Sequence, residues 1–408
     1  MKQLVVLFIV TIVWSCNYNT NNTSKNSTLK DGFYRGTLEV QDTYVLPFVF
    51  EVVDKGRLKV FNAESVIETD EIRYVKDSVY IQLPVFEGYI AATFDDTTLK
   101  GAFIKSQLGR VVPFTAKYNE KERFVTKSKP NTDVSGVWEV IFNKDDANET
   151  YMAKGLFEQK GNKVTGTFRT TTGDYRFLEG VVDGDEMKLS TFDGAHAFLF
   201  VAKVTDSTMN GQFYSGNHWK APFEAKRNAS YKLPHETTLT FLKEGYEGIA
   251  FNFPDSNGDM HSLKDERFRD KVVLIQLMGT WCPNCLDEST YYVSQYQDLK
   301  AKGVEIVALA FEYAKNKTTA YKNIERLQQT LGIEYPILLA QYGTTNKEKA
   351  QEKLPMLNQI LSYPTTVFID KLGKVRKIHT GFNGPATGQK YLDYQNEFQA
   401  FVMELVAE

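Results

Sequence analysis

The sequence predicts a multidomain fold: an all-β antiparallel N-terminal region, made of two repeated barrel or sandwich units, followed by an α/β domain. Its length of 408 residues suits two to three domains. From residue 31 to about residue 228, short runs of alternating apolar residues are interrupted by Gly, Asp and Asn, as in antiparallel strands joined by turns. From about residue 245 onward, buried-strand runs alternate with helical spacing of apolar residues, which indicates an α/β domain.

The first fifteen residues have the pattern of an export signal. Residues 4–14 form an almost purely apolar run of eleven, whereas a membrane-spanning helix needs about 20. The run ends just before Cys16, which resembles the lipobox of bacterial lipoproteins, where the cysteine carries lipid and becomes the new N-terminus. We therefore expect a lipoprotein signal peptide at 1–15 and a lipidated Cys16 followed by a polar tether at 16–30. A plain signal peptide with an incidental cysteine is the alternative.

The β region contains an internal repeat. The run DTTLKGAF, which begins at Asp96, recurs as DSTMNGQF at Asp206, and a second pair of matching runs follows in the same order and at nearly the same spacing. We therefore predict two β units at 31–120 and 131–229, each with room for about eight short strands. The pattern fits two small barrels or sandwiches, and it fits one merged sheet system equally well.

The C-terminal part predicts the order strand, helix, strand, helix, strand, helix, β-hairpin, helix over residues 245–408. The expected strands are 272–277, 304–311, 335–339, 365–369 and 375–378. A helix that ends at Gly303 follows the first strand, and another runs through Ile324 and Leu331. Apolar residues from Tyr394 to Leu405 have the spacing of a closing amphipathic helix.

The junction between the first of these strands and its helix carries the run Trp281-Cys282-Pro283-Asn284-Cys285. A strand, a Trp-Cys-x-x-Cys that opens a helix and a distant proline before the hairpin together resemble the thioredoxin fold. The closer resemblance, over about 245–408, is to the TlpA/ResA-like membrane-anchored thiol–disulfide oxidoreductases. It implies an enzyme that exchanges disulfides through its CPNC dithiol, most often as a reductant.

The resemblance also implies roles for neighbouring residues. Glu288 matches the family's acidic residue on the helix and would lie near Cys285 to assist its proton transfer. Pro364 would be cis, lie against the cysteine pair, leave a backbone edge free for the substrate and prevent metal capture by the thiols. The sequence departs from thioredoxins at Gln276, where they keep a buried aspartate, and at Tyr363, where smaller residues are usual.

The CxxC spacing itself favours redox chemistry. Residues three apart at the start of a helix face each other, with Cα atoms close to the ~5.5 Å that a disulfide needs. The unpaired N–H groups and the dipole there favour an anion, and such placement lowers a thiol pKa from about 8.5. We therefore expect Cys282, at the first position of the helix, to be the exposed, low-pKa nucleophile, and Cys285 to be the shielded resolving thiol. Pro283 fits the first turn.

Other functions are weighed against this one. A thiol peroxidase of the peroxiredoxin type needs a proline in the lead-in to its cysteine, and none precedes Cys282 there. A metal-binding or metal-delivery protein could use the CxxC pair, but two sulfurs supply only half of the ligands of a structural zinc site. His379 is distant in the sequence and could join the two cysteines only if the fold brings it close to them. The β region could be a binding module, although we expect His196 and His218 to lie on strand surfaces.

Composition and the N-terminal pattern limit location and partners. Lys+Arg 48 against Asp+Glu 51 gives a net charge of −3, which argues against nucleic acid as a partner. We expect no cofactor and no metal. The expected partners are protein thiols and disulfides, an upstream electron donor in the envelope, and a membrane held through the lipid on Cys16. The expected location is the bacterial cell envelope, with the α/β domain on the periplasmic or extracytoplasmic side.

Overall fold

The computed structural model describes residues 28–408. The expected signal peptide, Cys16 and nearly all of the expected tether lie outside these residues. Within the described part of the chain, no helix is both long and apolar enough to cross a bilayer.

The first β unit is an open antiparallel sheet. Alternating burial along its strands places one face in a shared core, as β1 shows with Tyr34 and Leu38 buried. The order is β4-β3-β2-β1-β9-β8-β7-β6-β5, and the edge strands β4 and β5 are not paired with each other. This unit has nine strands, one more than expected: β1 (Gly32–Glu39), β2 (Val45–Val53), β3 (Arg57–Asn62), β4 (Ser65–Thr69), β5 (Ile72–Val75), β6 (Ser78–Gln82), β7 (Tyr89–Phe94), β8 (Thr98–Lys105) and β9 (Arg110–Tyr118).

The second β unit is a closed antiparallel barrel of eight strands, in which β10 pairs with β17. The strands are β10 (Gly136–Phe142), β11 (Tyr151–Lys160), β12 (Lys163–Thr170), β13 (Leu178–Asp183), β14 (Glu186–Phe192), β15 (Ala197–Val204), β16 (Thr208–Ser215) and β17 (Trp219–Arg227). The repeated sequence runs occupy equivalent places, because β8 pairs with β9 and β9 with β1 in one unit, as β16, β17 and β10 do in the other.

The two β units pack against each other through buried polar contacts as well as apolar ones. Asn62 on β3 donates to the carbonyl of Phe192 on β14 at 2.8 Å and accepts from its N–H at 3.1 Å. The guanidinium of Arg123, in the connection between the units, is buried and donates to the carbonyl of Phe61 and to the hydroxyl of Ser190 at 3.0 Å. These bonds satisfy donors and acceptors that burial would otherwise leave unpaired.

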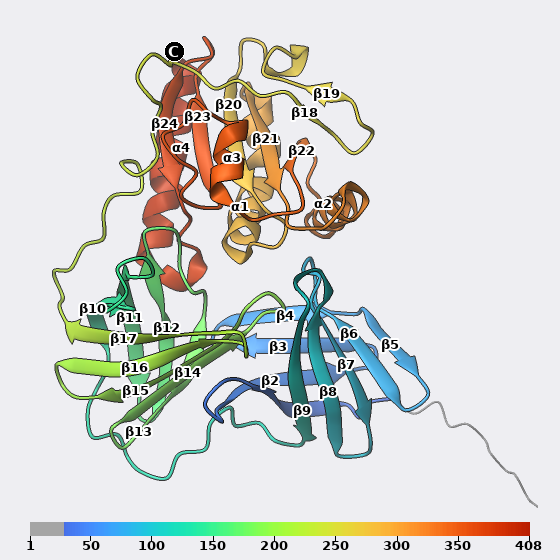
Figure 1. Cartoon of the computed structure of the whole chain (residues 1–408), viewed down its shortest axis with the longest axis vertical. Coiled ribbons are helices and arrows are strands. Elements are labelled where there is room, and N and C mark those ends of the chain that lie inside the picture. Colours follow the sequence, from blue (N-terminus) through green and yellow to red (C-terminus); the bar gives the residue numbers. More distant parts are fainter. Residues whose placement is uncertain (1–27) are drawn as a thin grey trace, which may run out of the picture.

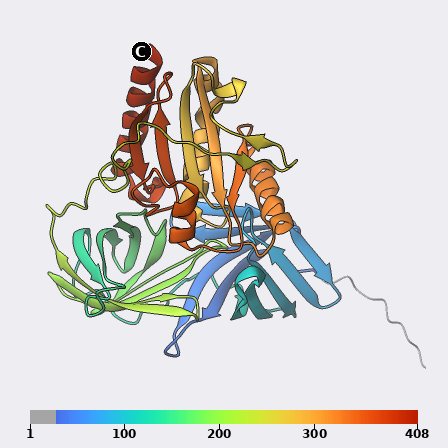
Figure 2. The same cartoon turned by 45° about the horizontal axis from the view of Figure 1, so that its top comes forward.

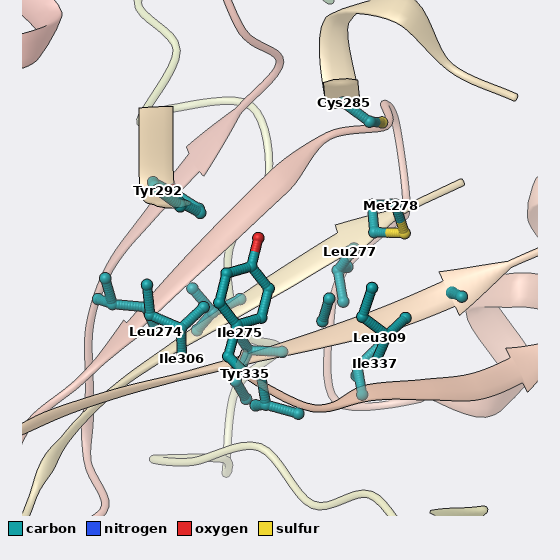
Figure 3. Packing of buried hydrophobic residues seen from close by; sticks show 14 of the residues in the cluster. Leu274, Ile275, Leu277, Met278, Cys285, Tyr292, Ile306, Leu309, Tyr335 and Ile337 are labelled. Atoms are coloured by element: carbon teal, nitrogen blue, oxygen red, sulfur yellow. The ribbon is translucent and has the colours of Figure 1, made fainter. Parts of the chain in front are cut away.

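The C-terminal domain has a five-stranded sheet of order β22-β21-β20-β23-β24, with β20, β21 and β22 parallel and β23 antiparallel to β20. Its core lies on the sheet, where every residue of β20 is buried, as expected for a strand covered on both faces (Figure 3). The elements are β18 (Phe253–Pro254), β19 (Met260–His261), β20 (Val272–Met278), α1 (Pro283–Ala301), β21 (Val304–Phe311), α2 (Lys317–Leu331), β22 (Ile337–Gln341), α3 (Lys347–Lys353), β23 (Thr365–Ile369), β24 (Val375–Thr380) and α4 (Gln389–Ala407).

The C-terminal domain stands on the β region, above the place where the two β units meet (Figures 1 and 2). Val85 and Phe86 of the first unit are buried in the core of the C-terminal domain. The connection after β17 has no helix or strand of its own before β18 and is bound to the C-terminal domain, where the Phe241 N–H donates to Asn358 at 2.9 Å. The start of α1 lies at the boundary between the three parts, where Cys282, Pro283 and Asn284 line a pocket together with residues of both β units.

Candidate active site

Cys282 is the N-cap residue of α1, one position before the expected first position of the helix. Its sulfur accepts a hydrogen bond from the Cys285 N–H at 3.2 Å, which satisfies one of the unpaired donors of the helix start. Its thiol donates to the Tyr363 carbonyl at 3.4 Å. The expectation of an exposed Cys282 is wrong: the residue is 6% exposed, and the pocket that it lines is bounded on its other side by residues of the β region.

Cys285 is fully buried in the first turn of α1. It lies at the edge of the domain core, on the side of Met278 and Leu277 (Figure 3). Both cysteines carry free thiols. Burial raises the pKa of the Cys285 thiol well above its ordinary value, and the neighbouring Cys282 and Glu288 raise it further. The pair is therefore unequal, since Cys285 resists losing its proton.

Glu288 lies one turn after Cys285 and is also fully buried, so it is not an ordinary exposed helix carboxylate. It accepts hydrogen bonds from Gln276 at 2.8 Å and from the hydroxyl of Thr366 at 3.1 Å. Burial nonetheless raises the pKa of Glu288 to about 7, because the loss of water outweighs these hydrogen bonds. A carboxyl with this pKa can take up or release a proton near neutral pH.

Pro364 follows a cis peptide bond from Tyr363, and this loop lies beside the thiol of Cys282. The Tyr363 ring packs between Trp281, with ring centroids 5.8 Å apart, and Phe311, at 5.3 Å. The indole N–H of Trp281 donates to the Phe311 carbonyl at 2.9 Å. Aromatic packing therefore fixes both the residue before the nucleophile and the residue before the proline.

Thr280 is held by a second buried carboxylate that sequence reasoning missed. Glu312, directly after β21, accepts from the N–H and the hydroxyl of Thr280, each at 2.7 Å. Burial raises the pKa of Glu312 to about 7. This contact joins the turn before Cys282 to the end of the neighbouring strand.

The barrel binds the CPNC motif directly. Asn284, the third residue of the motif, donates to the Asp174 carbonyl at 3.1 Å and to the Phe382 carbonyl at 3.0 Å. Asp174, in the loop between β12 and β13, is buried and accepts from the Gly384 N–H at 2.7 Å. Next to it, Gly173 has φ of +146°, and a Cβ there would lie 2.6 Å from the Asn284 amide nitrogen, so only glycine fits.

Arg176, in the same loop, forms the principal ion pair between the barrel and α1. Its guanidinium donates to both carboxylate oxygens of Asp287, at 3.0 and 2.7 Å, and to Asp193 at 2.9 Å. Asp193 is 3% and Asp287 13% exposed at the side chain, so the pair is largely shielded from water. Such bidentate pairs are directional, and they fix the loop against the helix.

The structure brings together most of the residues that the sequence singled out. Cys282, Cys285 and Glu288 share α1, Trp281 and Pro283 flank the nucleophile, and Pro364 lies next to it. His379 is buried on β24, and no group of His, Cys, Asp or Glu among residues 28–408 could hold a metal ion. Cys16 lies outside the described residues.

The histidines of the β region were expected on strand surfaces, and this expectation is wrong: His196 lies in the connection between β14 and β15, and His218 lies in the turn between β16 and β17. His196 and His218 line a pocket that also contains Cys282 and Trp281. Sequence reasoning also missed Asn284, Asp174 and Arg176 as interface residues. Neither the CPNC motif nor any periodicity indicates these contacts, because the partners lie about a hundred or more residues apart in the chain.

Comparison with known proteins agrees with the C-terminal fold. The Redoxin family matches residues 243–393. Thiol-disulfide oxidoreductase ResA of Geobacillus thermodenitrificans is 31% identical over 145 residues, which cover 36% of this chain and 74% of the relative. ResA of Bacillus subtilis is 30% identical over 157 residues, covering 38% and 75%. The crystal structure of a putative thiol:disulfide interchange protein DsbE from Chlorobium tepidum matches 40% of this chain and 99% of that chain, with 21% identity and a TM-score of 0.29.

The chain belongs, through its C-terminal domain, to the TlpA/ResA-like thiol–disulfide oxidoreductases of the thioredoxin superfamily. The predicted fold class, an all-β antiparallel region followed by a thioredoxin-like α/β domain, is confirmed.

Proposed function

We propose that this oxidoreductase is a lipid-anchored disulfide reductase of the bacterial cell envelope, which works through Cys282 and Cys285. The observation that carries the proposal is the unequal buried pair: a cysteine at the N-cap of α1 and a fully buried partner whose pKa is raised, one turn from Glu288. Its substrates are disulfides, and an upstream thiol donor in the envelope restores the dithiol.

The reaction has two exchange steps. The Cys282 thiolate attacks one sulfur of the substrate disulfide, so a mixed disulfide forms and the first substrate thiolate leaves and takes up a proton. Cys285 then attacks the Cys282 sulfur, which releases the second substrate thiol and leaves a Cys282–Cys285 disulfide. Two electrons and two protons pass from the protein dithiol to the substrate.

Glu288 serves the second step in this proposal. Cys285 must lose its proton to attack, and its raised pKa opposes that loss. Glu288 is the buried carboxyl that acts on the pKa of Cys285, and its own pKa of about 7 lets it accept the proton near neutral pH. Trp281, Pro283 and Pro364 shape the site around the nucleophile.

The reductive direction follows the resemblance to the TlpA/ResA-like family, whose members most often act as reductants. A strongly oxidising dithiol protein is one whose reduced form is stabilised, and in thioredoxin-like proteins this goes with a strongly lowered thiol pKa. Trapping of a substrate half on Cys282 tests the exchange mechanism, and the reduction potential tests its direction.

The lipid anchor rests on the N-terminal sequence alone. We expect Cys16→Ser to move the protein from the membrane fraction to the soluble fraction, because the lipid on Cys16 would be its attachment. Detergent-free washing, ultracentrifugation and immunoblotting measure this, with Cys282→Ser as a control that should stay membrane-bound. A Cys16→Ser protein that pellets as completely as the wild type would show that the anchor lies elsewhere.

A further inference from the structure

A pocket of about 350 Å³ lies between the C-terminal domain and the β region and reaches Cys282. Trp281, Cys282 and Asn284 line one side of it. Lys105 and Arg110 come from the first β unit, and His218 comes from the barrel. All three parts of the protein are therefore needed to enclose the space in front of the nucleophile. Its volume lies at the small end of the range for small-molecule sites, roughly 300–1,000 Å³.

The β wall of this pocket is basic. Neither Lys105 nor Arg110 is ion-paired with a carboxylate of residues 28–408, and the Lys105 ammonium donates instead to the Ala195 carbonyl at 3.1 Å. Burial lowers the pKa of both cations. Burial, with Arg110 and Lys105 close by, lowers the pKa of His218 to about 4, so this side chain is neutral at neutral pH.

The nearest carboxylates are Glu87 and Asp193, which act on the charge of Lys105 but hydrogen-bond to other groups. Glu87, outside the pocket lining, accepts from the Tyr313 hydroxyl at 2.9 Å, and Asp193 is bound by Arg176 at 2.9 Å. Asp193 is already balanced by Arg176, so Lys105 and Arg110 outnumber the one remaining carboxylate, Glu87, and leave a net positive charge beside the pocket. An anionic group there would gain more than it would in open water, because the surrounding protein screens it less.

The barrel also restricts access to Cys282. Its β12–β13 loop lies on the segment before Pro364, where the hydroxyl of Ser362 donates to the Thr172 carbonyl at 2.9 Å. Gly173, the next residue of this loop, forms a β-bridge with Phe382 of the C-terminal domain. The face beside Tyr363 on which a folded protein would lie is therefore covered by the protein's own barrel, and the pocket is left as the approach to the 6% exposed Cys282.

We propose that the preferred substrate is a low-molecular-weight disulfide that carries carboxylates, with one sulfur at Cys282 and a carboxylate against Lys105 and Arg110. This inference rests on the proposed reductase function and names its substrate class. The substrate reacts through the same two exchange steps. Its S–S bond breaks, two small thiols leave with two protons, and the protein keeps the disulfide between Cys282 and Cys285.

The test compares three small aliphatic disulfides of similar length and different charge: dithiodipropionate, hydroxyethyl disulfide and cystamine. The reduced full-length protein is mixed with each, and thiol release is followed and divided by the rate of the same disulfide with dithiothreitol, which removes intrinsic reactivity. We expect the anionic disulfide to be reduced at least about tenfold faster than the neutral one, and the cationic one to be slowest.

A double variant, Lys105→Met with Arg110→Gln, should bring the three normalised rates within about twofold of each other while hydroxyethyl disulfide is still reduced. The matched control removes two cations of the same β unit outside the pocket, Arg57→Gln with Lys59→Met, and should keep the wild-type preference. If the control lost the preference for the anionic disulfide to the same extent, the preference would come from the net charge of the protein, and the proposed role of the pocket would be wrong.

The remaining outcomes separate the two proposals. If the wild-type protein reduces all three disulfides at equal normalised rates, the proposed substrate class is wrong, but the reductase function is retained. If it reduces none of them, the proposed reductase function is wrong. Faster reduction of a short acidic peptide with an internal disulfide than of dithiodipropionate would overturn the restriction to small molecules.

Discussion

Cys282→Ser is expected to abolish disulfide exchange, whereas Cys285→Ser is expected to accumulate a mixed disulfide on Cys282. The reason is the asymmetry of the pair: Cys282 caps α1 and lines the pocket, while Cys285 is fully buried with a raised pKa. Attack survives in the Cys285 variant, but the resolving thiol is missing. With hydroxyethyl disulfide as substrate, intact-mass measurement should find one substrate half per chain in this variant and none in the Cys282 variant.

The same experiment also measures alkylation of the reduced wild type. Cys282 should be labelled much faster than Cys285 near neutral pH, since only Cys282 reaches the pocket. A substrate half found on Cys285 in the Cys282→Ser protein would reverse the assigned roles. The absence of an adduct in both variants, with zinc bound to the wild type, would favour the metal-binding alternative.

Glu288→Gln should change the pH dependence of stability and slow the resolving step. The folded-state pKa of Glu288 is about 7, against an ordinary 4.5, so the folded protein holds this proton more tightly than the unfolded chain does. This contribution is fully present below about pH 4.5 and is lost as the pH rises to about 7. The loss is ~3 kcal/mol, at 1.36 kcal/mol per pKa unit.

Urea unfolding of the reduced proteins measures this prediction. From about pH 5 to about pH 8, the variant should gain ~2–3 kcal/mol of unfolding free energy relative to the wild type. The mixed disulfide should also resolve more slowly in the variant, because Cys285 loses its proton acceptor. Glu397→Gln, which changes an exposed carboxylate on α4, should show neither effect. A wild-type-to-variant difference that does not vary with pH would mean that Glu288 titrates normally.

The sequence predicted what depends on local spacing. The strand from Val272, the CPNC turn and the proximity of Glu288 to Cys285 all follow from periodicity and from separations of a few residues, which helix and strand geometry fix. The repeat in the β region was visible for the same reason, because matching turns recur at a constant offset. The estimate of about eight strands per unit is one short for the first unit, which has nine, because it rests on segment length alone.

Contacts between distant parts of the chain could not be predicted in this way. The change of pattern near residues 231–247 suggests a C-terminal domain that is independent of the β region. Independent folding of that domain stays a prediction, but the pattern gives no sign that Arg176 pairs with Asp287 or that Asp174 binds Asn284 in the CPNC motif. From the sequence alone, these polar residues are expected on exposed loops and on an exposed helix surface. They gain their partners only when the barrel packs on α1. The pocket in front of Cys282 also depends on packing between distant parts of the chain.

The reduction potential of the Cys282–Cys285 pair tests the central claim most directly. Full-length protein is equilibrated with graded ratios of oxidised and reduced dithiothreitol, quenched and alkylated, and the fraction of dithiol is read by mass. For a disulfide reductase we expect a single two-electron transition, with a midpoint closer to thioredoxin's value of about −270 mV than to the oxidant DsbA's value of about −120 mV. A midpoint near −120 mV would contradict a reductase, and the lack of any two-electron transition would contradict dithiol chemistry altogether.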